Sequence, residues 1–196
     1  MKFLHCFCVV DSSLRILWVG GDWDDFALRN GGSTARANDV LATRLTDYIT
    51  DSATTDTVEQ MVRVVIESQG TLRMDYRCDG PDELRRFRLT IKPMKDARVI
   101  MVHELRDAIR LETPMTAWSY DPAARDQKCS VCGLVHVAGA AWHDPTEPGS
   151  GHPALVYYTV CPACHDRINA AVAELAQGAV QGDVGDVALT PGFNRG

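Results

Sequence analysis

Four of the seven cysteines form two CxxC pairs, Cys129 with Cys132 and Cys161 with Cys164. Two cysteines three positions apart can direct both sulfurs inward from one tight turn, and two such turns surround a point with four thiolates. This donor set is typical of a tetrahedral structural zinc site. Gly133 follows the first pair, where the turn commonly closes through a residue of positive φ that glycine adopts without strain. The sequence therefore predicts a zinc site whose ligands are Cys129, Cys132, Cys161 and Cys164.

The second pair is expected in the first turn of a helix. Pro162 suits a first helical position, and apolar residues then recur at helical spacing at Ile168, Ala171, Val172 and Leu175. The helix dipole favours a thiolate at that end. A knuckle, here residues 129–133, followed by a helix that carries the second pair resembles the treble-clef-like zinc modules.

Other chemistry stays open for the same cysteines. Four thiolates also hold an iron–sulfur cluster, and a zinc–thiolate site can release its metal when the cysteines are oxidised. Two disulfides would require an exported chain, and a redox CxxC normally follows a strand in an α/β unit, which neither pair does. Four histidines lie nearby and could replace a cysteine, but four cysteines already complete the shell, so we expect these histidines at the surface or around the ligands: His136, His143, His152 and His165.

Composition sets limits on the function. Hydrophobic residues make up 45% of the 196 residues, which supports a folded core. A net charge of −6 argues against nucleic acid as a partner, because phosphate binding needs clustered Lys and Arg. Asp11 ends the first apolar run too early for a signal peptide, and no other segment approaches membrane-spanning length. Seven cysteines, an odd number, fit a reducing compartment, so we expect a cytoplasmic protein.

Hydrophobic periodicity predicts strands over 3–10 and 14–19, a helix after Asp22, and a longer helix from Thr54 or Thr55 to Gly70. From Leu72 onward the period changes to two, which predicts three strands joined by hairpin turns. The order is therefore strand, strand, several helices, strand, strand, strand.

That order over residues 1–107 resembles the PAS domain family. Val10-Asp11 to Ile16 followed by Trp23-Asp24-Asp25-Phe26-Ala27 is similar to the opening hairpin and first helix of the family. The closing strands are matched by Arg85-Arg86-Phe87-Arg88-Leu89-Thr90-Ile91-Lys92-Pro93 and by Val99-Ile100-Met101-Val102-His103-Glu104. The resemblance implies an α+β fold, a five-stranded antiparallel sheet with helices on one face. It also implies a sensor or dimerisation module of bacterial signalling, with a homodimer and a small-molecule pocket.

The expected organisation has four parts. Residues 1–107 form the PAS-like domain, 108–127 a helical connector, 128–177 the four-cysteine zinc module and 178–196 a flexible tail.

Within the PAS-like part, few residues suggest a cofactor. His5 and His103 fall in strands, and a lone histidine on an apolar strand is more often a hydrogen-bonded core residue than a haem ligand. Cys6 and Cys8 share a strand face and are interpreted as small buried apolar residues, with a thiol sensor as the alternative. Cys78 ends a predicted strand beside a turn, where it can be exposed, and is given no special role. A basic strand face is interpreted as solvated and balanced by nearby acids, with anion or partner binding as the alternative: Arg73, Arg77, Arg85, Arg86, Arg88 and Lys92.

No phosphate-binding glycine loop, nucleophile elbow or paired-carboxylate motif is present in the sequence, and four cysteines around one metal leave no open coordination position. We therefore expect a non-enzymatic signalling or regulatory protein with a protein partner, whose zinc is structural. The alternatives are a redox or metal sensor that uses the four cysteines and an enzyme with a ligand-activated pocket.

Overall fold

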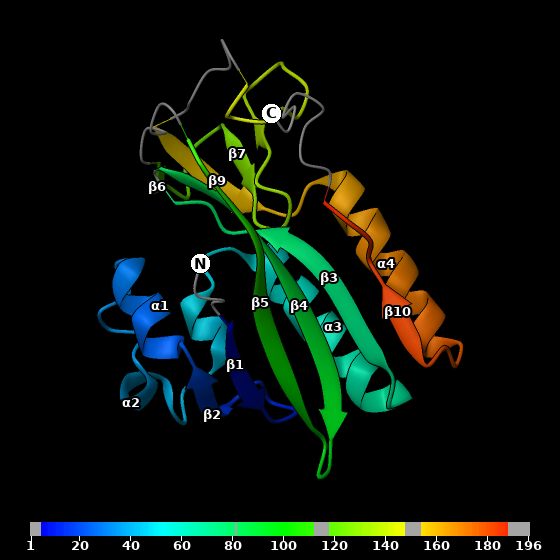
Figure 1. Cartoon of the computed structure of the whole chain (residues 1–196). Helices are drawn as coiled ribbons and strands as arrows, with labels where there is room; N and C mark the ends of the chain where they lie inside the picture. Colours follow the sequence, from blue (N-terminus) through cyan, green and yellow to red (C-terminus); the bar gives the residue numbers. More distant parts are fainter. Residues whose placement is uncertain (1–4, 81, 112–117, 148–153, 188–196) are drawn as a thin grey trace.

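The computed structural model describes residues 5–80, 82–111, 118–147 and 154–187. Within these ranges the chain has an α+β fold with four α-helices and two sheets (Figure 1). The larger sheet forms the body of the molecule, and the smaller sheet lies beyond one end of it. The expected α+β class is confirmed.

The larger sheet has six strands in the order β10-β3-β4-β5-β1-β2. Their bounds are β1 (His5–Val10), β2 (Ile16–Gly21), β3 (Thr71–Arg77), β4 (Glu83–Met94), β5 (Arg98–Arg110) and β10 (Gln181–Asp183). The five strands predicted from the sequence pair antiparallel, but β10 pairs parallel with β3. The prediction of a five-stranded antiparallel sheet was therefore wrong: the sheet has six strands and is mixed.

The sixth strand comes from the segment expected to be a flexible tail. Residues 178–187 of that segment include β10, and Val184 and Val187 are buried. Gly182 makes the pairing possible, because a Cβ there would lie 2.8 Å from the carbonyl oxygen of Ala171. The rest of the predicted tail, residues 188–196, lies outside the described residues.

Helices cover one face of the larger sheet. They are α1 (Trp23–Arg29), α2 (Ala37–Val40), α3 (Ser52–Ser68) and α4 (Pro162–Ala176), with a 3-10 turn at Leu45–Tyr48. The carboxylate of Asp51 caps α3 by accepting the N–H of Thr54 at 2.7 Å, so this helix begins slightly earlier than predicted. It ends at Gln69, whose φ is +57°, followed by Gly70. Helix α4 packs beside α3, where the Gln60 side chain donates to Asn169 at 3.1 Å.

The smaller sheet has four strands in the order β6-β9-β7-β8. They are β6 (Ser119–Tyr120), β7 (Gln127–Cys129), β8 (Val135–His136) and β9 (Leu155–Thr159). The predicted helical connector 108–127 has no helix in its described residues; instead β5 continues to Arg110 and β6 adds to the smaller sheet. Residues 112–117 of that connector lie outside the description.

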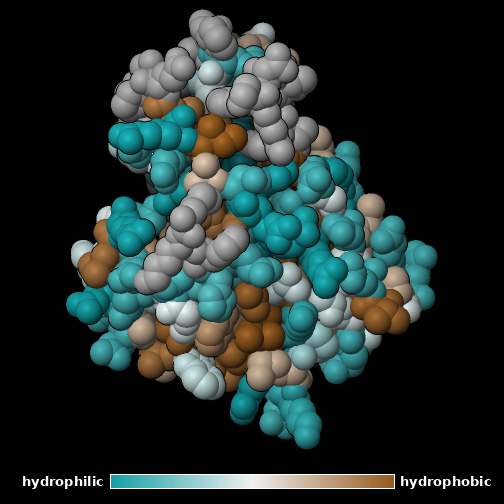
Figure 2. Space-filling view, in the orientation of Figure 1, coloured by the Kyte–Doolittle hydropathy of each residue, from teal (hydrophilic) through white to brown (hydrophobic). Residues whose placement is uncertain are grey.

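Strand register decides which side chains face the helices. Cys8 pairs with Val19 and Met101, and these three lie on the helix-covered face. On the opposite face Val9 pairs with Trp18 and Ile100. Apolar residues gather on the side of the sheet seen in Figure 2, over the region of β1 and β5.

The core is continuous through both sheets. Buried residues of α3 and the larger sheet pack in one cluster with the four cysteines of the two CxxC pairs and with apolar residues of α4 such as Ile168 and Leu175. The cysteine region is thus packed onto the larger sheet and α3. No helix in the described ranges is long and apolar enough to cross a membrane.

Candidate metal centre

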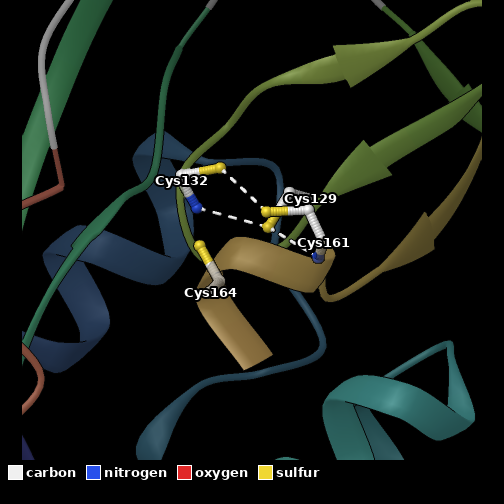
Figure 3. Close-up of side chains that lie close together, drawn as sticks. All are labelled: Cys129, Cys132, Cys161 and Cys164. Carbon is white, nitrogen blue, oxygen red and sulfur yellow. Dashed lines mark hydrogen bonds between the residues drawn. The ribbon is translucent and has the colours of Figure 1, made fainter. Parts of the chain in front are cut away.

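The four predicted ligands converge on one point (Figure 3). Cys129 ends β7 and Cys132 lies in the turn after it, while Cys161 precedes α4 and Cys164 lies in its first turn. All four sulfurs lie within 4.8 Å of one another, and all four residues are buried. Helix α4 begins at Pro162 with Cys161 as its N-cap, as the sequence predicted.

Backbone amides surround the Cys129 sulfur. It accepts N–H groups of Val131 at 3.4 Å, Cys132 at 3.5 Å and Cys161 at 3.3 Å. These donors come from both CxxC segments, so the backbone around the site favours negative charge on this sulfur. The arrangement suits a metal-bound thiolate, because a sulfur that coordinates a metal ion can still accept hydrogen bonds from N–H groups.

The sulfur distances fit a single tetrahedral ion. A zinc–sulfur bond of about 2.3 Å places tetrahedral sulfurs about 3.8 Å apart, and the Sγ atoms of Cys132 and Cys161 are 3.7 Å apart. A disulfide requires about 2.05 Å, and all seven cysteines are free. Four buried cysteines at these distances indicate a metal site.

The pKa shifts of the clustered cysteines also favour a bound metal. Hydrogen bonds from Cys132, Cys161 and Cys164 hold the pKa of the Cys129 thiol far below its usual value. The hydrogen bond to Cys129 raises the pKa of Cys132 well above its usual value. Without a cation the cluster therefore accommodates a thiolate at Cys129 only while a neighbour stays protonated. A divalent cation removes this conflict, because it stabilises every coordinating sulfur as thiolate.

Two cationic side chains lie beside the cluster. Arg167 donates from Nη2 to the Cys164 sulfur at 3.2 Å and from Nη1 to the Asp186 carbonyl at 2.7 Å. Lys128 is buried over the ring of Trp118 at 4.0 Å, and burial lowers its pKa to about 8. These cations offset the negative charge of a metal bound by four thiolates.

The knuckle is fastened to the end of β3 through Arg77. The Arg77 N–H donates to the Val131 carbonyl at 2.8 Å. The guanidinium forms buried ion pairs with Asp79, at 2.7 Å, and with Asp144. Gly133 has φ +74°, a backbone conformation that glycine adopts without strain. A Cβ at this position would lie 3.0 Å from Arg77 Nε, so glycine also leaves room for the Arg77 side chain.

The described histidines take no part in the cluster, which consists of cysteines only among residues 5–80, 82–111, 118–147 and 154–187. The His136 and Trp142 rings lie 5.4 Å apart and tilted by 36°, His143 contacts the Ala141 carbonyl, and His165 contacts Asn169. His152 lies outside the described residues. The interpretation of these histidines as other than ligands is consistent with the three positions seen.

A second feature, an apolar cavity of ≈220 Å³, lies between the larger sheet and α3. His103 lies at its wall, and its Nδ1 is 2.8 Å from the Tyr76 hydroxyl, so the prediction of a hydrogen-bonded core histidine is confirmed. Burial lowers the pKa of His103 to about 4. Cys6 and Cys8 are buried as predicted, and burial raises their pKa values to about 11 and about 12. Cys78 is half-buried.

Two arginines of the predicted basic face are solvated and balanced by acids, as the sequence suggested. Arg88 pairs with Asp75 at 2.7 Å, and Arg86 pairs with Asp107. Arg77 differs, because it is buried between Asp79 and Asp144 rather than solvated. The role of Arg77 was not predicted, because Asp144 is remote from it in sequence and no local pattern marks either residue as buried.

Comparisons with known proteins show no family. No protein-family model matches the chain, and no curated protein matches it. Among solved structures, the chain is similar to a domain of an HTR-like protein from Haloarcula marismortui, at 16% identity and a TM-score of 0.40. That match covers 53% of this chain and 98% of the other.

Proposed function

We propose that this chain is a non-enzymatic regulatory protein in which a PAS-like ligand-sensing domain is held to a structural zinc module. The observation that carries the proposal is the cage of four buried sulfurs, built from two segments that are far apart in the chain and packed against the larger sheet. Zinc suits this donor set, because it prefers four sulfur ligands in tetrahedral geometry and has no redox chemistry.

The residues of the chain have separate roles in this proposal. The four cysteines hold the ion, the amides of Val131, Cys132 and Cys161 support the Cys129 thiolate, and Arg167 offsets charge at Cys164. Bound zinc would supply folding free energy and no reaction, since four protein ligands leave no open position. The metal thereby fixes the knuckle against α4.

The sensor role is supported by the arrangement of helices over one face of the larger sheet and by the cavity between them. A small molecule bound there is the proposed signal, and its occupancy would be transmitted through contacts with a protein partner. Seven free cysteines support a reducing compartment, so we place the protein in the bacterial cytoplasm.

A homodimer is the proposed assembly, through the sheet face opposite the helices. Trp18 there is 65% exposed and makes an edge contact with Phe7, and Val9, Ile100 and Val102 share this face by register. We expect Trp18→Asp to convert dimers to monomers in sedimentation equilibrium. Leu28→Asp, at a 52% exposed position on α1, is the matched control. A wild-type monomer at high concentration would contradict this assembly.

A redox or metal sensor is the second candidate. The Cys132 and Cys161 sulfurs, at 3.7 Å, need to approach by less than 2 Å to form a disulfide once metal has left. An iron–sulfur cluster is less well supported, because several irons and sulfides between the thiolates require wider spacing than the 4.8 Å limit seen here.

Elemental analysis of protein purified without added metal tests the proposal. We expect one zinc per chain in the wild type and in Cys78→Ser, and loss of zinc with partial unfolding in Cys161→Ser. Iron with sulfide and a visible absorption band, or reactive thiols with no metal, would instead make the cysteine cluster the sensor.

A further inference from the structure

The cavity between the larger sheet and α3 is closed at one end by the cysteine region. Most of its wall comes from β-strands and α3, including Met61, Met74 and Met101. Ser130 and Val131 also line it, and both lie between the first two cysteines. Val160, which lines it too, directly precedes Cys161. Both CxxC segments therefore contribute to the wall of a cavity that belongs to the PAS-like part.

The lining determines what the cavity accepts. Among the residues that the structure describes, no Asp, Glu, Lys or Arg lines it, so an ion would lose its hydration without gaining a partner of opposite charge. Its wall is apolar except at a few atoms, among them the Tyr76 hydroxyl with its His103 partner. His103 is neutral near pH 7, since burial lowers its pKa to about 4. The cavity therefore favours a neutral molecule.

One polar atom of the described cavity wall lacks a hydrogen-bond partner. The Thr54 Oγ1 is buried, and no hydrogen-bond partner occurs for it among the residues that the structure describes. Thr54 lines the cavity, and a buried hydroxyl without a partner destabilises the fold unless a bound molecule satisfies it. A cavity of about 150 Å³ accommodates benzene, so ≈220 Å³ accommodates one ring system with a polar substituent.

We infer that this cavity binds a small neutral molecule of one or two fused rings that carries one hydrogen-bonding group, and that this ligand and the metal bind cooperatively. The inference rests on the proposed zinc site. Metal bound by Cys129, Cys132 and Cys161 fixes the positions of Ser130, Val131 and Val160, so the cavity is complete only when the metal is present. By thermodynamic linkage, the ligand must strengthen metal binding by the same factor.

Calorimetric titration of the full-length, zinc-loaded protein with indole, phenol and cyclohexanol tests the ligand class. We expect at least one of them to bind with a dissociation constant below 1 mM, and indole-3-carboxylate, which is charged, to bind at least tenfold more weakly than indole. Thr54→Val should reduce the affinity for the tightest-binding probe about tenfold, and the variant should still contain one zinc per chain. Val58→Phe, which fills the cavity from α3, should abolish binding, and Val180→Phe, at an 85% exposed site, should not.

The coupling is tested by measuring zinc affinity against a chromophoric chelator, with and without the saturating probe. We expect a five- to hundredfold increase in zinc affinity with the probe. An unchanged zinc affinity would overturn the coupling, and the failure of all three probes to bind zinc-loaded protein would overturn the ligand site. Both results are distinct from failure of the proposed function, in which the purified protein would contain no zinc.

Discussion

The guanidinium of Arg77, at the end of β3, forms a buried ion pair with Asp144 in the loop that follows β8. The same guanidinium pairs with Asp79 in the turn after β3, so the cation lies between a carboxylate of the larger sheet's own turn and one of the cysteine region. Its side chain is fully buried. This charge cluster, together with the Arg77 amide bonded to Val131, holds the knuckle on the sheet.

Arg77→Met should destabilise the protein by about 3–5 kcal/mol, because it removes a buried cation that forms ion pairs with two buried carboxylates. Arg86→Met is the matched control: its partner Asp107 is 37% exposed, and exposed pairs contribute about 0–1 kcal/mol. Urea unfolding of the two zinc-loaded variants measures the difference. Equal losses for both would show that the Arg77 cluster does not fasten the knuckle.

Gly133→Ala should cost more stability than Gly139→Ala. Both glycines have positive φ, +74° and +87°, so each substitution costs about 1 kcal/mol for the backbone. A Cβ at 133 also meets Arg77 Nε at 3.0 Å, whereas nothing lies within 4 Å of one at 139. For Gly133→Ala alone, we expect the free energy of unfolding to decrease by about 1–2 kcal/mol more, a cost typical of overpacking, and zinc to bind more weakly. Chelator competition and thermal unfolding give the two readouts, and identical behaviour of the variants would refute the contact.

Stability should fall as the pH is lowered from about 6.5 toward 4. Burial depresses the pKa of folded His103 to about 4, while the unfolded chain titrates near 6.5. Between these pH values the unfolded state binds more protons than the folded state. The free energy of unfolding therefore decreases as the pH falls, by roughly 3 kcal/mol in total. His103→Gln should flatten this part of the profile. If the wild type and variant show the same slope, another group, such as the metal-binding thiols, causes the pH dependence.

Alkylation at pH 8 should separate the four metal ligands from the buried Cys6 and Cys8. In zinc-loaded protein the four ligands should be protected, and chelation should expose them to iodoacetamide. Cys6 should stay unmodified until the protein unfolds, because a pKa of about 11 leaves roughly one thiolate in a thousand. Cys8, with a pKa of about 12, should react more slowly still. Mass spectrometry of peptides measures each site, and rapid labelling of the cluster before chelation would argue against bound metal.

The cysteine cluster could be predicted from sequence because its information is local. Each CxxC turn is short, and Pro162 with the apolar spacing after it marks the start of α4. Alternating residues predicted β3, β4 and β5 for the same reason, since each strand buries one face. The bounds changed mainly where pairing extends a strand, as in β5, which continues to Arg110 opposite β4.

The remaining features depend on contacts that sequence spacing does not show. Strand β10 has only three residues, with glycine in the centre, so its sequence shows no alternation of apolar and polar residues. Its position is determined by pairing with β3 and by the contact of Gly182 with Leu175. The burial of Arg77 depends on Asp144, and the cavity wall depends on where Val131 lies after the knuckle folds onto β3. Each of these requires the tertiary structure.

The pairing of β10 with β3 also has a consequence for synthesis of the chain. Gln181 pairs with Thr71, so the outer edge of β3 stays unpaired until residues 181–183 have been synthesised. Exposed strand edges recruit other strands and promote aggregation. Closing the cysteine cluster brings α4, and with it β10, to that edge. Scarcity of metal during translation would therefore reduce the yield of correctly folded protein.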